Sequence, residues 1–233
     1  MNSSDLENIK GIIFDLDDTL YNAQDAYAKA LDALKLSPED PRYLDARKSV
    51  KSCLPDKHVS ARNRLLYFKR LCENSNQGSP AKILETMEIY ENALREEIQR
   101  QWQGLNRGPL LSWLKSRFKL IILTNENTRT QLLKMSVIDP HSEYFSSILT
   151  SEEMGFEKPD PRAFQIALEA LELEACECLM IGDSLKNDIW PALNSGIYAV
   201  WSGEFTKESP ENETNDSYLS IDNLEEMKEI LTP

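Results

Sequence analysis

The sequence predicts an α/β fold: a Rossmann-like parallel sheet that carries an inserted, all-helical subdomain. Along most of the chain, short apolar runs of strand length alternate with helical patterns, which is typical of a parallel sheet covered by helices on both faces. After the first strand this alternation stops for a long stretch that shows helical spacing only. It resumes beyond Gly104, Gly108 and Pro109, which mark a boundary.

Six short apolar segments are predicted to be the strands. Each is bounded by polar or turn-forming residues, and at this length that favours a strand over a helix. Because the runs are apolar without alternation, both faces of the sheet should be buried. The expected strands cover residues 10–14, 120–124, 147–150, 179–181, 198–201 and 219–221.

The segments between these strands are predicted to be helices. Asp160 is a suitable N-cap, and Pro161 after it stands at the first helical position, where proline is favoured. Pro191 would lie in the first turns of another helix and alter its packing. The expected helices of this part cover residues 109–117, 128–135, 161–171, 187–194 and 224–231.

The stretch between the first two strands is expected to form a separate helical cap. It contains predicted helices at residues 23–36 and 62–71 and a longer one that begins at Pro80, after Ser79 as N-cap. We expect a core of residues 1–20 and 106–233, and a cap of residues 21–105 over the carboxyl ends of the strands. That edge of an open α/β sheet is where ligands bind.

Composition narrows the function classes. The chain has 233 residues, of which 41% are hydrophobic and 28% charged, as in an ordinary globular protein. No segment is apolar for long enough to span a bilayer, and the polar first ten residues lack an apolar signal core, so we expect a cytoplasmic protein. The four cysteines complete no zinc-binding pattern and are expected to be reduced.

The formal net charge of -13 disfavours nucleic acids and anionic membranes as partners. A phosphate-bearing small molecule would need a local positive site within this negative field. The charge does not predict the oligomeric state.

Chemistry-bearing residues stand where predicted strands end. Asp15 and Asp17 follow the first strand, two positions apart, and two carboxylates in one small volume call for a cation or a shared proton. With Asp183 they form a hard oxygen site suited to Mg²⁺. The Thr124 hydroxyl and the Lys158 ammonium suit a phosphoryl group, whose transfer needs mainly positioning and charge neutralisation.

These residues belong to four motifs by which the chain resembles the haloacid-dehalogenase-type phosphohydrolase superfamily. The resemblance covers residues 10–20 and 108–201. The motifs occur in order: Asp-Leu-Asp-Asp-Thr-Leu from Asp15, Leu-Thr-Asn from Leu123, Gly-Phe-Glu-Lys-Pro-Asp-Pro from Gly155, and Ile-Gly-Asp-Ser-x-x-x-Asp from Ile181. The helical insertion stands at the position of the family's C1 cap.

The resemblance implies a Mg²⁺-dependent phosphatase that acts through an aspartyl-phosphate. Asp15 would be the nucleophile and a Mg²⁺ ligand. Asp17 would be the general acid and base, and its backbone carbonyl would bind the metal. Asp183 would be the third protein ligand, and Asp188 would orient the metal site or the phosphate-binding lysine.

The remaining positions implied by the resemblance bind the phosphate. They are Thr124, the backbone of Asn125, and Lys158. The substrate would be a small phosphate monoester of the nucleotide or sugar phosphate class, and the segment 151–164 is similar to that of phosphatases acting on nucleotides or acylneuraminate phosphates.

Other functions use the same residues. A phosphomutase of this fold would differ only in whether the cap excludes water and retains the intermediate. A catalytically idle binding protein would use the cap as an interaction surface. A dehalogenase is disfavoured because dehalogenase members do not need the acid/base aspartate that Asp17 provides.

A basic cluster in the cap has two interpretations. Arg62, Arg64, Lys69 and Arg70 would form either a solvated helix face or a lip that attracts anionic substrates. In the second case, charge reversal at Arg62 or Arg64 would raise KM.

Overall fold

The computed structural model describes residues 6–55, 58–206 and 217–232. Its centre is a six-stranded parallel sheet with strand order β3-β2-β1-β4-β5-β6. The strands are β1 (Gly11–Phe14), β2 (Lys119–Thr124), β3 (Ser147–Thr150), β4 (Cys178–Gly182), β5 (Tyr198–Ser202) and β6 (Leu219–Ile221). Each lies within two residues of a segment predicted from the sequence, and the α/β prediction is confirmed.

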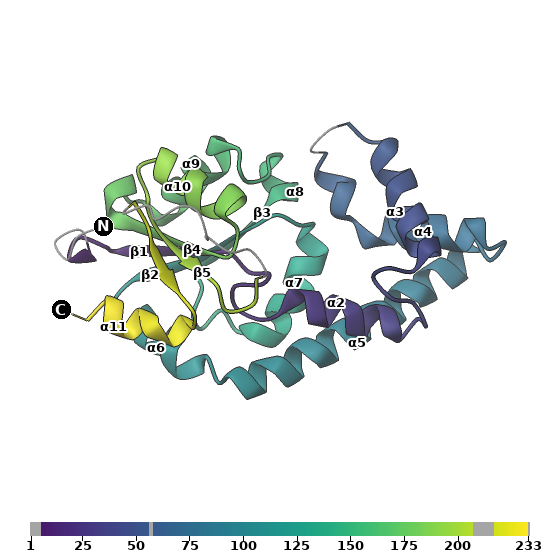
Figure 1. Ribbon diagram of the computed structural model, residues 1–233, viewed down its shortest axis with the longest axis horizontal. Helices are drawn as coiled ribbons and strands as arrows, with labels where there is room; N and C mark the ends of the chain where they lie inside the picture. The colour runs from purple at the N-terminus through teal and green to yellow at the C-terminus, as the bar shows by residue number, and fades with distance from the viewer. Residues whose placement is uncertain (1–5, 56–57, 207–216, 233) are drawn as a thin grey trace.

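The central strands β1 and β4 are buried along their whole length, which explains their continuous apolar runs. Ile12 and Phe14 point into one hydrophobic cluster, and Ile13 between them points into another on the opposite face. The helices on the Ile13 face are α9 (Pro161–Leu171) and α10 (Trp190–Asn194). The other face carries α6 (Gly108–Lys115), α7 (Thr128–Ile138) and α11 (Met227–Ile230). Figure 1 shows the helices flanking the sheet.

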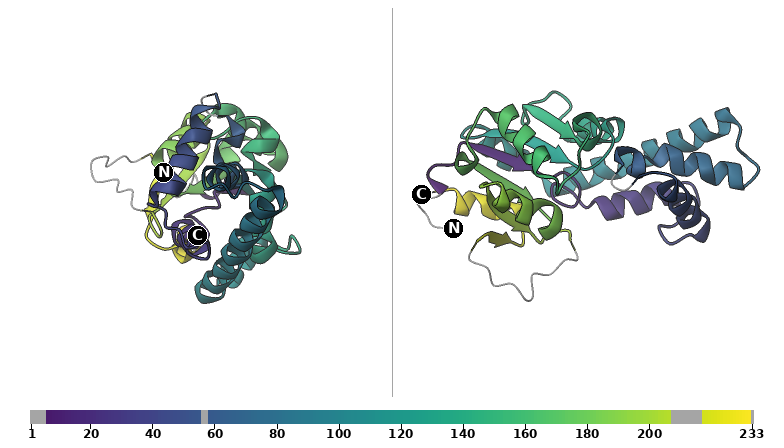
Figure 2. Two further views of the ribbon diagram at one scale, coloured as in Figure 1. Left: turned by 90° about the vertical axis from the view of Figure 1, so that its right-hand side faces the viewer. Right: turned by 90° about the horizontal axis from the view of Figure 1, so that it is seen from above.

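Four further helices extend away from the sheet (Figures 1 and 2). They are α2 (Ala23–Asp32), α3 (Pro41–Ser52), α4 (Arg64–Asn74) and α5 (Pro80–Leu105). We call residues 23–105 the helical block. Within its described residues no strand occurs, as the sequence predicted.

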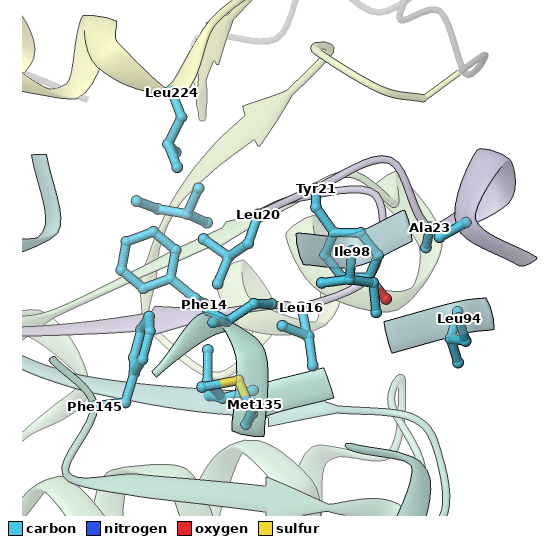
Figure 3. Close-up of a cluster of buried hydrophobic side chains, with 14 of the residues drawn as sticks. Phe14, Leu16, Leu20, Tyr21, Ala23, Leu94, Ile98, Met135, Phe145 and Leu224 are labelled. Atoms are coloured by element: carbon cyan, nitrogen blue, oxygen red, sulfur yellow. The ribbon is translucent and has the colours of Figure 1, made fainter. Parts of the chain in front are cut away.

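The helical block shares a hydrophobic cluster with the sheet. Ala23 of α2 and Leu94 and Ile98 of α5 belong to the same buried cluster as Phe14 (Figure 3). Helix α5 packs against α2 and α4 within the block and against α7 beside the sheet. The longest helix therefore ties the block to the sheet.

Three helical segments differ from their predicted form. The helix predicted over 23–36 ends at Asp32, because the chain turns through Lys35 (φ 56°) and the Leu36 N–H returns to the Leu31 carbonyl. In the segment predicted as a helix over 187–194, a π-helical turn, Leu185–Ile189, precedes α10. Pro191 provides the reason, since it cannot donate the regular helical hydrogen bond and its ring needs space.

The third difference is α3, which was not among the helices predicted from the sequence. Its start repeats the start of α9: Asp40 and Asp160 each precede Pro-Arg and accept hydrogen bonds from the backbone and guanidinium of that arginine. The capping signal was therefore present in the sequence. Its apolar positions Tyr43, Ala46 and Val50 follow helical spacing, but they are few among charged and polar residues.

Among the described residues, no helix combines the length and apolarity that crossing a membrane requires.

Candidate active site

The carboxyl ends of the three central strands bring the predicted site residues together. Phe14 of β1 is in register with Ile122 of β2 and Ile181 of β4, so the residues that follow them emerge side by side. They open into a pocket of about 280 Å³. All seven residues proposed from the sequence line it: Asp15, Asp17, Thr124, Asn125, Lys158, Asp183 and Asp188.

Lys158 lies at the centre of this pocket, and its side chain is only 2% exposed. Its ammonium donates to Asp15 Oδ1 at 2.6 Å and to Asp188 Oδ1 at 2.5 Å. Burial alone would lower the pKa of Lys158, but these two carboxylates outweigh it and raise the pKa above its usual value. Lys158 is therefore a fixed positive charge inside an acidic protein.

Asn125 positions Lys158 through the backbone. The Asn125 amide donates to the Lys158 carbonyl and accepts from the Lys158 N–H, both at 2.7 Å. Thr124 is positioned by Gln131 of α7, whose amide donates to Thr124 Oγ1 at 2.6 Å. The Thr124 hydroxyl proton therefore stays available for an oxygen in the pocket.

Three carboxylates form a compact group in this pocket. Oxygens of Asp15, Asp183 and Asp188 all lie within 4.8 Å of one another. Gly182 permits this approach, because a Cβ at that position would stand 2.6 Å from the Asp188 side chain. In the described chain, no hydrogen-bond donor or ion-pair partner contacts the Asp183 carboxylate.

The electrostatics of the group call for a cation. Burial, followed by the carboxylates of Asp15 and Asp188, raises the pKa of Asp183 to about 9. Burial also raises the pKa of Asp15 to about 7, although Lys158 opposes this effect. Hard carboxylate oxygens of this kind fit Mg²⁺, whose binding would displace the protons that the group otherwise retains at neutral pH.

Asp17 is held by a second buried lysine that the sequence analysis missed. Lys134 of α7 is fully buried, and its ammonium lies 2.7 Å from both Asp17 carboxylate oxygens. Tyr21 and Tyr27 also donate to Asp17, at 2.6 and 3.0 Å. Burial alone would raise the pKa of Asp17, but Lys134 and the two hydroxyls prevail and lower it.

A signal for Lys134 was present in the sequence. Lys134 stands one turn after Gln131, on the face of α7 that also buries Ile138. A lysine on the buried face of a helix requires an acidic partner. The pattern does not identify that partner, because it lies 117 residues away along the chain.

Three further pocket residues, Asp18, Ser184 and Asn187, lie within the motifs but were not proposed as site residues. Arg62, for which the sequence left open a role as a lip for anionic substrates, also lines the pocket and comes from the helical block. Arg62 extends the pocket beyond the strand ends and places the block at its edge.

Comparisons with known proteins identify the family of this chain. A family model described as haloacid dehalogenase-like hydrolase matches residues 9–196. The chain is similar to the glyceraldehyde 3-phosphate phosphatase of Methanothermobacter thermautotrophicus, with 28% identity over 96% of this chain and 100% of the relative. It is also similar to the N-acylneuraminate-9-phosphatase of Homo sapiens, with 25% identity over 84% and 83%.

Among solved structures, the fold is similar to that of a 2-haloacid dehalogenase from Pseudomonas syringae. The TM-score is 0.68 with 26% identity, covering 96% of this chain and 98% of the other. The family match spans more than half of the chain and includes every residue of the acidic pocket. The protein therefore belongs to the haloacid dehalogenase-like hydrolases.

Proposed function

We propose that this protein is a Mg²⁺-dependent phosphatase that hydrolyses small phosphate monoesters through an aspartyl-phosphate on Asp15. The observation that carries the proposal is the pocket itself, which combines a buried carboxylate, a second carboxylate two residues on, and a fixed ammonium with a hydroxyl donor. Relatives named as phosphatases support the reaction class.

The first step would form a bond between an Asp15 carboxylate oxygen and phosphorus as the ester P–O bond breaks. The Lys158 ammonium, the Thr124 hydroxyl and backbone N–H groups would hold the phosphoryl oxygens while this happens. Mg²⁺, held by Asp15, Asp183 and the Asp17 carbonyl with Asp188 beside them, would neutralise charge and keep Asp15 ionised.

Asp17 would move the protons. As a general acid it would give a proton to the departing alkoxide, and as a base it would then take one from the water that releases inorganic phosphate. Its pKa is held low by Lys134, so its contact with that ammonium has to loosen before it can act as an acid. Tyr27, on α2, shares this contact and offers a link to the helical block.

We propose that residues 21–105 act as the cap and residues 1–20 and 106–233 as the core. Arg62 and Tyr27, which reach the catalytic groups from the helical block, support this division. Closure of the block would exclude bulk water while the acyl phosphate forms. We expect the protein to work in the cytoplasm.

Asp17 also separates this proposal from dehalogenation. A dehalogenase shares the fold, but an acid/base carboxylate beside the nucleophile is the group that a phosphate ester requires. A mutase would need the same groups, and it is tested by isomer formation from sugar phosphates.

The test is phosphate release from p-nitrophenyl phosphate, sugar phosphates and nucleotides, with Mg²⁺ and with EDTA. We expect release that requires Mg²⁺, that Asp15→Asn abolishes, and that Asp40→Asn retains, since Asp40 caps α3 outside the pocket. Full turnover by Asp15→Asn, or equal turnover in EDTA, would overturn the proposal.

A further inference from the structure

A second cavity, of about 640 Å³, lies within the helical block and adjoins the catalytic pocket. Arg62 lines both spaces. Tyr27 lines the second cavity, and its hydroxyl lies 3.0 Å from Asp17 in the first. A phosphate ester bound at Asp15 would therefore place the rest of its structure in this cavity, which we call the cap cavity.

The cap cavity is rich in cations although the protein is acidic overall. Arg47, Lys51, Arg62 and Arg64 line it, against two acidic side chains, Asp25 and Glu39. The formal net charge of the chain is -13, so an average part of its surface should carry more acidic than basic side chains. The cap cavity shows the reverse.

Two of these cations already have partners, and two do not. Arg64 pairs with Glu126 and lies over the Tyr27 ring, and Arg62 lies 3.2 Å from Glu157. In the described chain, neither Arg47 nor Lys51 makes an ion pair.

Lys51 lies close enough to the other cations of the cavity for them to affect its pKa. Burial, followed by the positive charges of Arg47, Arg62 and Arg64, lowers the pKa of Lys51. An anion placed between these groups would relieve their mutual repulsion.

The aromatic side chains that line the cap cavity give less support for binding a stacked nucleobase than the cations give for binding an anion. The face of Tyr27 carries the Arg64 guanidinium at 4.3 Å. Tyr43 packs edge-on against Tyr67, and Tyr90 packs against Phe68 with ring centroids 4.9 Å apart. These rings are already engaged with other side chains, which favours a charged ligand over a nucleobase.

We propose that the cap cavity binds a second anionic group of the substrate, so that the preferred substrates are phosphate monoesters carrying a carboxylate or a second phosphate. This inference rests on the proposed phosphatase function. It also divides the basic cluster of the cap: Arg62 and Arg64 face the cavity, whereas Lys69 and Arg70 contact Glu73 on the outer side of α4.

The experiment compares substrates that differ only in the second anion. For a carboxylate the pairs are 3-phosphoglycerate with glycerol 3-phosphate, and 6-phosphogluconate with glucitol 6-phosphate. For a second phosphate the pair is fructose 1,6-bisphosphate with fructose 6-phosphate. The readout is the ratio of kcat/KM within each pair, which cancels differences in enzyme concentration and stability.

We expect at least one ratio to exceed about tenfold in favour of the second anion, as one well-placed charge-assisted contact provides. The double variant Arg47→Gln/Lys51→Gln should bring that ratio close to one. The control Lys69→Gln/Arg70→Gln removes the same charge from the outer side of the block and should leave the ratio unchanged. Whether the carboxylate or bisphosphate pair responds identifies the anion.

Ratios near or below one in the unmodified protein would overturn the inference, as would a ratio that survives Arg47→Gln/Lys51→Gln, or a preference for nucleoside monophosphates over every acid-bearing ester. Asp15-dependent release from p-nitrophenyl phosphate is measured in the same samples. Its absence would refute the phosphatase proposal and this inference with it, whereas its presence with ratios near one would refute the second-anion inference alone.

Discussion

Two buried lysines each pair with a catalytic aspartate and lower its pKa, but the net shifts of the two aspartates are opposite. Lys158 bonds Asp15 and Asp188, yet the pKa of Asp15 is still raised to about 7. Lys134 bonds Asp17 with help from two tyrosine hydroxyls, and the pKa of Asp17 is lowered. Lys158 is shared by two neighbouring carboxylates, whereas Lys134 pairs with one.

This difference separates two chemical tasks. The side of Lys158 carries more negative charge than the lysine neutralises, which leaves room for a divalent cation and for a phosphoryl group. The charges of Lys134 and Asp17 already balance each other, so Asp17 is held in its ionised form. Substitutions at these lysines and their partners test this difference, and they are given in order of decreasing expected effect.

The largest effect should come from Lys158→Met. Loss of the ammonium leaves the phosphoryl oxygens without their fixed cation and should lower kcat/KM for p-nitrophenyl phosphate about a hundred- to a thousandfold. Lys186→Met is the control, because Lys186 is an exposed lysine of the π-helical turn Leu185–Ile189 that does not line the pocket. A loss below tenfold in a folded Lys158→Met protein would remove Lys158 from phosphate binding.

Lys134→Met should affect stability more than it affects phosphate binding. It leaves the partly buried Asp17 carboxylate without its ammonium and should lower the free energy of unfolding at pH 7 by about 2 kcal/mol. Urea unfolding measures this, with Lys115→Met as an exposed lysine control. The added change Asp17→Asn should restore most of the loss, because it removes the unpaired charge.

The pH dependence of this loss has a definite sign. In the unmodified protein the pKa of folded Asp17 lies below the usual 3.8, so its pairing stabilises the fold above that value and is lost as pH falls through the folded pKa. Without Lys134, burial would instead raise the pKa of Asp17. The stability difference between the two proteins should therefore shrink on acidification from pH 7 toward pH 4, and a constant difference would contradict the pairing.

The smallest effects should come from the two tyrosines. Tyr27 donates to Asp17 and accepts from Lys134, whereas Tyr21 bonds Asp17 alone. Removing one hydroxyl costs about 1 kcal/mol for each hydrogen bond lost, so Tyr27→Phe should destabilise more than Tyr21→Phe in matched urea unfolding. Equal losses would show that the contact between Tyr27 and Lys134 adds nothing.

The same two lysines show how far sequence reasoning reaches. Lys158 stands in a short motif beside a predicted strand end, so its place in the pocket followed from topology and local sequence. Lys134 contacts Asp17 across 117 residues, through the packing of α7 against the sheet. Nothing in the sequence next to either residue encodes that contact. A lysine on the buried face of a helix indicates only that it has an acidic partner somewhere in the fold.

The fold shows a similar division. Strand positions followed from continuous apolar runs, and the start of α5 followed from its Ser79 cap and Pro80. Helix α3 was missed because it has few apolar positions to form a stripe, and the π-helical turn at 185–189 was missed because it depends on how Pro191 is accommodated. The cap cavity lay beyond prediction, since only the assembled helices bring Arg47, Lys51 and Arg62 to one space.

The proposed aspartyl-phosphate on Asp15 can be tested by trapping it. Asp17→Asn is mixed with p-nitrophenyl phosphate, whose leaving group departs without a proton, so Asp15 can still be phosphorylated while its hydrolysis lacks a base. Acid quenching and peptide mass spectrometry then locate any added phosphoryl group. We expect a burst of p-nitrophenolate and one phosphoryl group on Asp15. Steady turnover without a burst, or a phosphoryl group on another residue, would contradict it.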